Sequence, residues 1–367
     1  MTVVICALVV ASASAAATPN ARGLLGQAAR LSGLPAQRPV PSATVAGARY
    51  EALLSRALNR DYPRALQRID TQLYARLGLT AASVRRETPM AAYVSRAWYD
   101  PAGRRLLLRR APLPRRAHVV HELVRALVDQ NFGLRRLAGL RVRNRDAAVA
   151  AHAIVEGTAA LASGLRARTP HGTPLERFLQ LEGSAGLGAG RALAAELQYL
   201  GGRSALRTAL RTFPQTTEQL LHIDKFLQRE RAVPIALPAA SGSTRLSASE
   251  TFGELDVREL LRAFSLPNAT SVAAGWGGGR LALYLTPSGE AVAALVLRWD
   301  SHDDAAEWRD AVSRFVSSAF ADATPRDCPP LDRCWSGTAE VAAGVLGNRS
   351  VFVSGPAAHF LAADLLS

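Results

Sequence analysis

Hydrophobic residues recur at helical spacing through most of the first 230 positions of the chain. Tyr50 to Leu79 carries this period and is interrupted only at Pro63, a residue that does not continue a helix interior. Further helices are predicted over 115–131, 146–165, 173–200, 203–212 and 218–227. A strand is predicted near 40–45. Two more, at 93–100 and 104–108, flank a Pro-Ala-Gly turn and predict a hairpin.

The pattern changes in the last third of the chain. Strands are predicted over 281–285, 291–299 and 351–353, and helices from Asp300-Ser301 onward and over 357–366. The run Gly275-Trp-Gly-Gly-Gly279 lacks the Lys-Ser/Thr of a phosphate loop and predicts a tight turn. The fold class is therefore α+β, predominantly helical. The predicted organisation is 1–17 signal peptide, 18–38 linker, 39–232 helical domain, 233–250 extended linker and 251–367 small α+β domain.

The first residues predict export. An apolar stretch from Val3 to Val10 is followed by small residues up to Ala15 and Ala17, which is typical of a signal peptide and its cleavage site. The stretch is shorter than the ~20 residues that span a bilayer. We therefore expect a secreted or extracytoplasmic protein with no transmembrane segment after the signal.

The net charge of +14 comes almost entirely from arginine, because Lys225 is the only lysine in 367 residues. The arginines occur singly or in pairs such as Arg85-Arg86, Arg104-Arg105 and Arg135-Arg136, without a dense run interleaved with aromatic residues. This pattern does not favour a nucleic-acid partner. It predicts only weak affinity for anionic polymers of the cell envelope.

Two cysteines remain once Cys6 leaves with the signal peptide. Cys328 and Cys334 are separated by five residues. In an exported chain this spacing predicts one disulfide that closes a small loop.

Candidate chemistry is concentrated in the segment 118–130. On a helix, His118, His121, Glu122, Arg125 and Asp129 fall on one stripe, whereas the other faces carry Val, Leu and Ala. A helix that is apolar nearly all round is buried. Its polar stripe then needs a partner, because a buried charge is costly unless it is paired or bound to a metal.

The helix predicted over 146–165 offers that partner. His152 and Glu156 are four residues apart and share a face, and the surrounding alanines allow a close approach of two backbones. Two such helices would direct His121, Glu122, Arg125 and Glu156 toward one point. An HExxH helix with a glutamate from a later helix is the way a zinc peptidase site is built.

Four motifs in fixed order resemble a family of exported, gluzincin-like zinc metallopeptidases of bacteria and archaea. They are Ala97-Trp-Tyr-Asp-Pro101, His121-Glu-Leu-Val-Arg-Ala-Leu-Val-Asp-Gln130, Val155-Glu-Gly-Thr-Ala159, and Thr217-Glu-Gln-Leu-Leu-His222 with Lys225-Phe226. The resemblance covers most of residues 35 to 320. It implies zinc as the cofactor, His121 and Glu156 as zinc ligands, and Glu122 as the catalytic general base.

Three positions depart from the family pattern. Arg125 replaces the second zinc histidine, Thr158 replaces an aspartate beside the third ligand, and Gly279 replaces an aspartate in the tail. Because one of three protein ligands is missing, we expect wild-type protein to hold zinc poorly.

Three hypotheses follow from these departures. In the first, the chain is a pseudo-peptidase in which the Arg125 cation replaces the metal cation and pairs with Glu156 or Glu122; it would bind a peptide or protein ligand without cleaving it. In the second, an active peptidase uses a displaced zinc site made of His118, His121, His152 and Glu156. In the third, the polar stripe is a satisfied core of a structural or cell-envelope binding protein.

Overall fold

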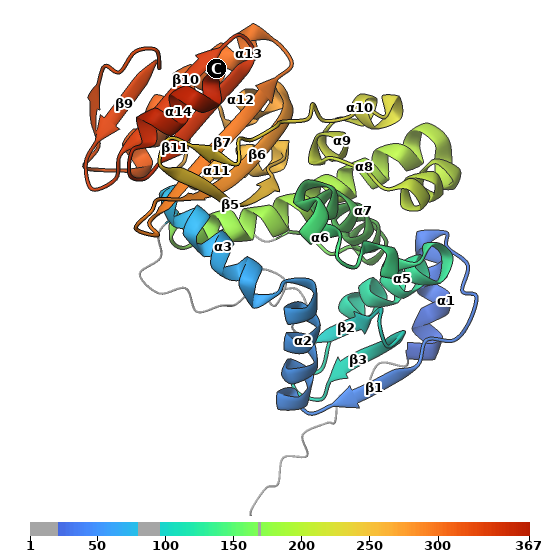
Figure 1. Ribbon diagram of the computed structural model, residues 1–367. Helices are drawn as coiled ribbons and strands as arrows, with labels where there is room; N and C mark the ends of the chain where they lie inside the picture. The colour runs from blue at the N-terminus through green and yellow to red at the C-terminus, as the bar shows by residue number, and fades with distance from the viewer. Residues whose placement is uncertain (1–20, 80–95, 168–169) are drawn as a thin grey trace, which may run out of the picture.

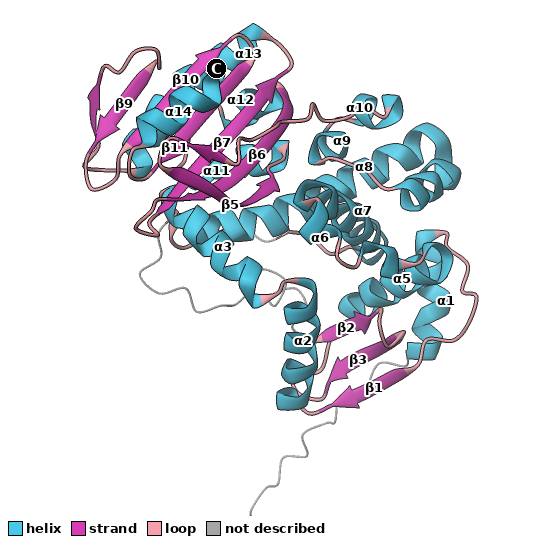
Figure 2. Ribbon diagram, in the orientation of Figure 1, coloured by secondary structure: helices cyan, strands magenta, loops and turns pink. Residues whose placement is uncertain are grey.

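The computed structural model describes residues 21–79, 96–167 and 170–367. The predicted signal peptide, the first residues of the predicted linker 18–38 and the start of the predicted strand 93–100 lie outside these ranges. Within them the chain forms a mixed α+β fold, as predicted (Figures 1 and 2).

The N-terminal unit is mainly helical. Its helices are α1 (Ala21–Ser32), α2 (Gly47–Asp61), α3 (Arg64–Arg76), α5 (Arg116–Phe132), the 3₁₀ helix η1 (Leu134–Leu137), α6 (Leu140–Arg143), α7 (Arg145–Ser163), α8 (Pro174–Thr212), α9 (Thr217–Leu221) and α10 (Ile223–Gln228). Its strands are β1 (Ser42–Val45), β2 (Ala97–Asp100) and β3 (Arg105–Arg109). The predicted helices and the predicted hairpin are thus confirmed wherever the structure describes them, except that the helix predicted over 218–227 is divided at His222 into α9 and α10.

The three strands form a small sheet in the order β1-β3-β2, with β1 parallel to β3. Alternating residues of β3 face opposite sides, as the strand period requires. Leu106 and Leu108 join the core that contains α5, whereas Leu107 packs with Tyr50 and Leu54 of α2. The sheet is therefore held between α2 and α5.

Local sequence explains where the long helices begin and bend. The Asn144 side chain accepts a hydrogen bond from the backbone of Ala147 at the start of α7, and Thr173 forms a capping box with Glu176 at the start of α8. Gly201 and Gly202 have non-helical backbone angles and kink α8. The predicted break between the helices 173–200 and 203–212 corresponds to this kink.

Helices α7 and α8 approach each other at a pair of glycines. A methyl group on Gly190 would lie 1.8 Å from the carbonyl oxygen of Ala153, and one on Gly157 would lie 2.0 Å from the carbonyl carbon of Gly190. Only glycine permits this backbone contact. It fixes α7, and with it Glu156, against the rest of the unit.

The tail unit is built on an antiparallel sheet of eight strands in the order β4-β5-β6-β7-β11-β10-β9-β8. These strands are β4 (Ala240–Ser241), β5 (Thr244–Thr251), β6 (Trp276–Leu285), β7 (Ala291–Trp299), β8 (Thr324–Arg326), β9 (Arg333–Ser336), β10 (Val341–Leu346) and β11 (Arg349–Ser354). Its helices are α11 (Glu254–Ala263), α12 (Ala269–Ala274), α13 (His302–Ala319) and α14 (Ala358–Leu366). The strands and helices predicted after residue 280 are confirmed.

Both faces of the tail sheet are covered. One face packs against α11, α12 and α13, and the other against α14 (Figure 1). Ser301 caps α13 by accepting from the backbone of Asp304, and Asp303 and Asp304 occupy its first turn, where negative charge favours the helix dipole.

The prediction of a tight turn over 275–279 is wrong. Trp276 to Gly279 begin β6, which pairs with β7 through an irregularity between Trp276 and Gly278. Glycine is required here because the backbone is crowded. A methyl group on Gly279 would lie 2.2 Å from the carbonyl oxygen of Phe252.

The predicted linkers are also shorter than expected. Helix α1 lies within 18–38, and β4 with most of β5 lies within 233–250. The two units are not cleanly separated either, because Leu73 and Tyr74 of α3 and Phe178 of α8 belong to the core of the tail unit. The exposed polar residues of β5 give this segment the sequence pattern of a linker.

Cys328 and Cys334 form a disulfide, as predicted. Among the residues that the structure describes, no helix combines the length and apolar character needed to cross a membrane.

Candidate functional site

The predicted site residues lie on two neighbouring helices. His121, Glu122 and Arg125 project from α5, and Glu156 projects from α7, which packs directly against α5. His121 and Glu122 are buried. The arrangement that the spacing of these residues predicts is therefore present.

Arg125 lies between the two carboxylates. Its Nη1 donates to Oε2 of Glu122 at 2.9 Å, and its Nε lies 2.8 Å from Oε1 of Glu156. Nε2 of His121 donates to Oε2 of Glu156 at 2.9 Å. Glu156 thus contacts His121 with one carboxylate oxygen and Arg125 with the other.

The charges in this cluster compensate one another. Burial alone would raise the pKa of the Glu156 carboxyl, but the Arg125 charge and the His121 hydrogen bond outweigh burial and hold that pKa well below its usual range. The two carboxylates likewise raise the pKa of Arg125 against the effect of its burial. Glu156 and Arg125 are therefore both ionised near neutral pH.

Strand β2 supports the helix pair from the other side. The backbone N–H of Tyr99 donates to Oε2 of Glu122 at 2.8 Å, and the Tyr99 hydroxyl donates to Oδ2 of Asp129 at 2.7 Å. The second oxygen of Asp129 accepts from the backbone of Leu134. The Trp-Tyr-Asp motif thus orients both acidic residues of α5, a role that its sequence spacing alone did not reveal.

The other residues singled out from the sequence lie at the edge of the Arg125 cluster or outside it. His118 is half-buried, and burial, with the neighbouring His121 and Arg115 charges, lowers the pKa of its imidazole. His152 is exposed, and its Nδ1 donates to the carbonyl oxygen of Ala148 at 2.7 Å. The hydroxyl of Thr158 donates to the carbonyl of Ile154 in its own helix, so it does not reach the cluster.

The fourth motif, Thr217 to Phe226, lies at the contact between the two units. Lys225 Nζ lies 2.5 Å from Glu218, 3.1 Å from Glu230 and 2.6 Å from Asp300 of the tail unit. These three carboxylates are also the group in the described residues whose oxygens lie close enough to one another to hold a cation. The lysine ammonium already occupies that position.

Further buried polar contacts, which no sequence pattern predicts, join the units. The Thr217 hydroxyl donates to Asp146 at 2.6 Å and accepts from the backbone of Leu255, while His222 Nε2 donates to Glu254 at 2.9 Å. Arg145, fully buried, pairs with Asp256. The order of these residues along the chain carried no sign of the pairing, because each partner is 30 or more residues away.

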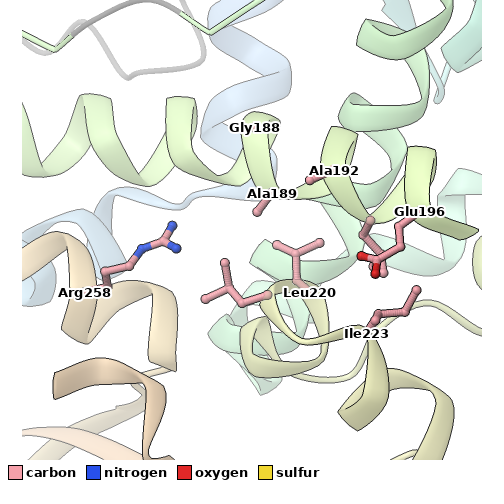
Figure 3. A pocket seen from close by; sticks show the side chains of 9 residues that line it. Gly188, Ala189, Ala192, Glu196, Leu220, Ile223 and Arg258 are labelled. Atoms are coloured by element: carbon pink, nitrogen blue, oxygen red, sulfur yellow. The ribbon is translucent and has the colours of Figure 1, made fainter. Parts of the chain in front are cut away.

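A shallow groove of about 260 Å³ lies apart from the Arg125 cluster, between α8, α9, α10 and α11. Its walls are small or aliphatic residues, and Glu196 and Arg258 stand at opposite ends (Figure 3). None of the predicted site residues lines it.

Comparison with known proteins reaches only the tail unit. Residues 244–364 match a family model described as a domain of unknown function, DUF8575. Neither the curated proteins nor the solved structures contain a match. The matched range begins at the first residue of β5, inside the eight-stranded sheet and ahead of the predicted domain start at residue 251.

Proposed function

We propose that this chain is an exported, catalytically inactive relative of zinc metallopeptidases, in which an arginine side chain takes the place of the metal ion. The observation that carries the proposal is the position of Arg125, whose guanidinium reaches Glu122 and Glu156 at 2.9 and 2.8 Å. These are the two glutamates that the family resemblance assigns to the base and to the third ligand.

The donor set argues against zinc in this arrangement. A peptidase zinc needs three protein ligands and an open position for water. Here Nε2 of His121 and one oxygen of Glu156 are used by each other, and the other oxygen of Glu156 faces Arg125. A positive side chain beside these ligands would also repel a divalent cation. We derive no hydrolytic step for this site.

Arginine suits the replacement because its planar fork makes several charge-assisted hydrogen bonds and stays protonated when buried. Removing a metal from a buried pair of carboxylates would otherwise leave them uncompensated. The retained fold then serves to bind a peptide or protein ligand rather than to cleave it.

One observation favours the displaced zinc site as a second candidate. Among the residues that the structure describes, Nδ1 of His118 and Nδ1 of His121 are buried without a hydrogen-bond partner, and the lowered pKa of His118 favours the neutral imidazole, the form that binds a metal. The engagement of His152 with its own helix weakens that candidate.

The predicted signal sequence and the Cys328–Cys334 disulfide support export. Disulfides of this kind persist in oxidising compartments.

Zinc content per chain, measured by atomic emission on wild type and on Arg125→His, tests the proposal. We expect little zinc in wild type and stoichiometric zinc in the variant, which regains a second histidine one turn after His121. Chelator should lower the melting temperature of the variant only. Stoichiometric zinc in wild type that is lost in His118→Ala would establish the displaced site instead, and zinc in neither protein would favour a purely structural core.

A further inference from the structure

Three segments of the N-terminal unit contain arginines and no acidic residue. They are residues 21–50, 133–145 and 197–217. In the sequence they are far apart, and their arginines look scattered. The fold gathers parts of all three at the end of the molecule where α1 and the C-terminal half of α8 lie, away from the tail sheet (Figure 1).

Direct contacts join these segments. Nη2 of Arg203 donates to the carbonyl oxygen of Arg30 at 3.2 Å, and the aliphatic part of the Arg203 side chain lies over Gly33. Nη2 of Arg136 donates to the carbonyl oxygen of Leu210 at 2.6 Å. The C-terminal end of α1 and the residues of η1 thus touch the same stretch of α8.

Along that stretch Arg203, Arg207 and Arg211 are spaced by four residues and form one stripe. Arg203 and Arg211 are exposed and Arg207 is half-buried. Within the described residues none of the three, nor Arg30, forms an ion pair with a carboxylate. One N–H donor of Arg203 is used at the C-terminal end of α1, where it bonds the carbonyl oxygen of Arg30. The guanidinium groups of Arg207 and Arg211 remain available to bind an anion.

Large apolar side chains are exposed immediately before the stripe in α8 and next to Arg30 in α1. Tyr199 is 88% exposed and Leu200 59%, immediately before the kink at Gly201-Gly202 that leads into Arg203. Leu31, next to Arg30, is 49% exposed. A purely electrostatic surface for a soluble polyanion has no use for these three, whereas tyrosine and leucine at the edge of a basic surface suit the boundary between lipid headgroups and acyl chains.

We propose that this surface, formed by Arg30, Leu31, Tyr199, Leu200 and the stripe Arg203, Arg207 and Arg211, binds an anionic phospholipid membrane peripherally. The guanidinium groups contact lipid phosphates, and Tyr199, Leu200 and Leu31 enter the headgroup region. This inference is independent of the proposed function, since no residue of the Arg125 cluster takes part.

Co-sedimentation of the full chain with vesicles tests it. Wild type binds phosphatidylcholine–phosphatidylglycerol vesicles, does not bind pure phosphatidylcholine vesicles, and loses affinity as salt rises. The triple variant Arg203→Gln, Arg207→Gln, Arg211→Gln weakens binding on the order of a hundredfold, since each basic residue near such a surface contributes about fivefold.

A matched control removes the same charge elsewhere. Arg309, Arg314 and Arg333 are exposed arginines of the tail unit, and their replacement by Gln changes affinity less than about threefold. Equal losses in the two triple variants would overturn the proposal in favour of a net-charge effect. The double variant Tyr199→Ser, Leu200→Ser also weakens binding at constant charge. Full binding by that variant, or binding of polyphosphate with no binding of vesicles, would show an electrostatic surface for soluble polyanions instead.

Discussion

Arg125 and Glu156 join helix α5 to helix α7 through an ion pair of 2.8 Å in which the arginine side chain is 14% exposed and the glutamate side chain 29%. The same guanidinium holds Glu122. A single cation therefore compensates two carboxylates that the packing of the helices forces together, and the stability of the helix pair depends on it.

Removal of this cation has a large expected cost. We predict that Arg125→Met lowers the free energy of unfolding by about 3–5 kcal/mol at neutral pH, because Glu122 and Glu156 lose the cation that compensates both charges. Urea denaturation measures this difference. Arg60→Met is the control: the pair of Arg60 with Asp61 is more than half exposed, and its loss should change the same free energy by less than about 1 kcal/mol. Similar effects of the two substitutions would contradict the compensating role of Arg125.

The sequence predicted the local elements of the site and failed on long-range pairing. The positions of α5 and α7 and the convergence of His121, Glu122, Arg125 and Glu156 followed from helical spacing, because one period places residues on one face. The roles of Tyr99 and Lys225 did not follow from spacing. Tyr99 lies 30 residues from Asp129 and Lys225 lies 75 residues from Asp300, and only the packed fold brings each pair together.

The tail shows the same limit. The apolar runs of β6 and β7 predict strands, whereas β5 exposes polar residues and has the pattern of a linker. Gly278 and Gly279 allow close backbone contacts inside a strand, although glycine runs more commonly indicate turns.

The α7–α8 contact gives a second prediction with a close control on the same helix. Gly190→Ala places a methyl group against the Ala153 carbonyl, and we expect a loss of about 1–3 kcal/mol or more from the forced separation of the helices. Gly188→Ala meets no atom of the described residues within 4 Å outside its own turn of helix and should stabilise α8 by up to about 1 kcal/mol. Thermal and urea unfolding of both variants measures the contrast. A neutral Gly190→Ala would mean that the helices lie farther apart than the structure places them.

The disulfide gives a third prediction. Non-reducing peptide mapping of protein recovered from outside the producing cells should show the peptides of Cys328 and Cys334 linked to each other. Replacement of both cysteines by serine should lower the free energy of unfolding by about 2 kcal/mol, since the bridge restricts the unfolded chain. Two free thiols in exported protein would refute the predicted bridge.

The contact between the two units predicts a pH dependence through Glu218. Burial raises the pKa of its carboxyl to about 7, and the hydrogen bond and charge of Lys225 only partly oppose that rise. In the unfolded chain the same carboxyl has a pKa of roughly 4.3. The folded state therefore binds this proton more tightly, so the contribution of the neutral carboxyl to stability is complete below about pH 4 and is lost as pH rises through about 7.

Glu218→Gln removes this titration while keeping the shape of the side chain. We expect the free energy of unfolding of the variant to fall less steeply than that of wild type between about pH 4 and 7, as measured by urea denaturation at a series of pH values. Glu307→Gln changes an exposed carboxylate of α13 and should leave the slope unchanged. Parallel pH profiles for wild type and Glu218→Gln would contradict the raised pKa. They would mean that the pairing of Lys225 with Glu218, rather than burial, governs the protonation of this carboxyl, and that the contact between the units is held by a full ion pair.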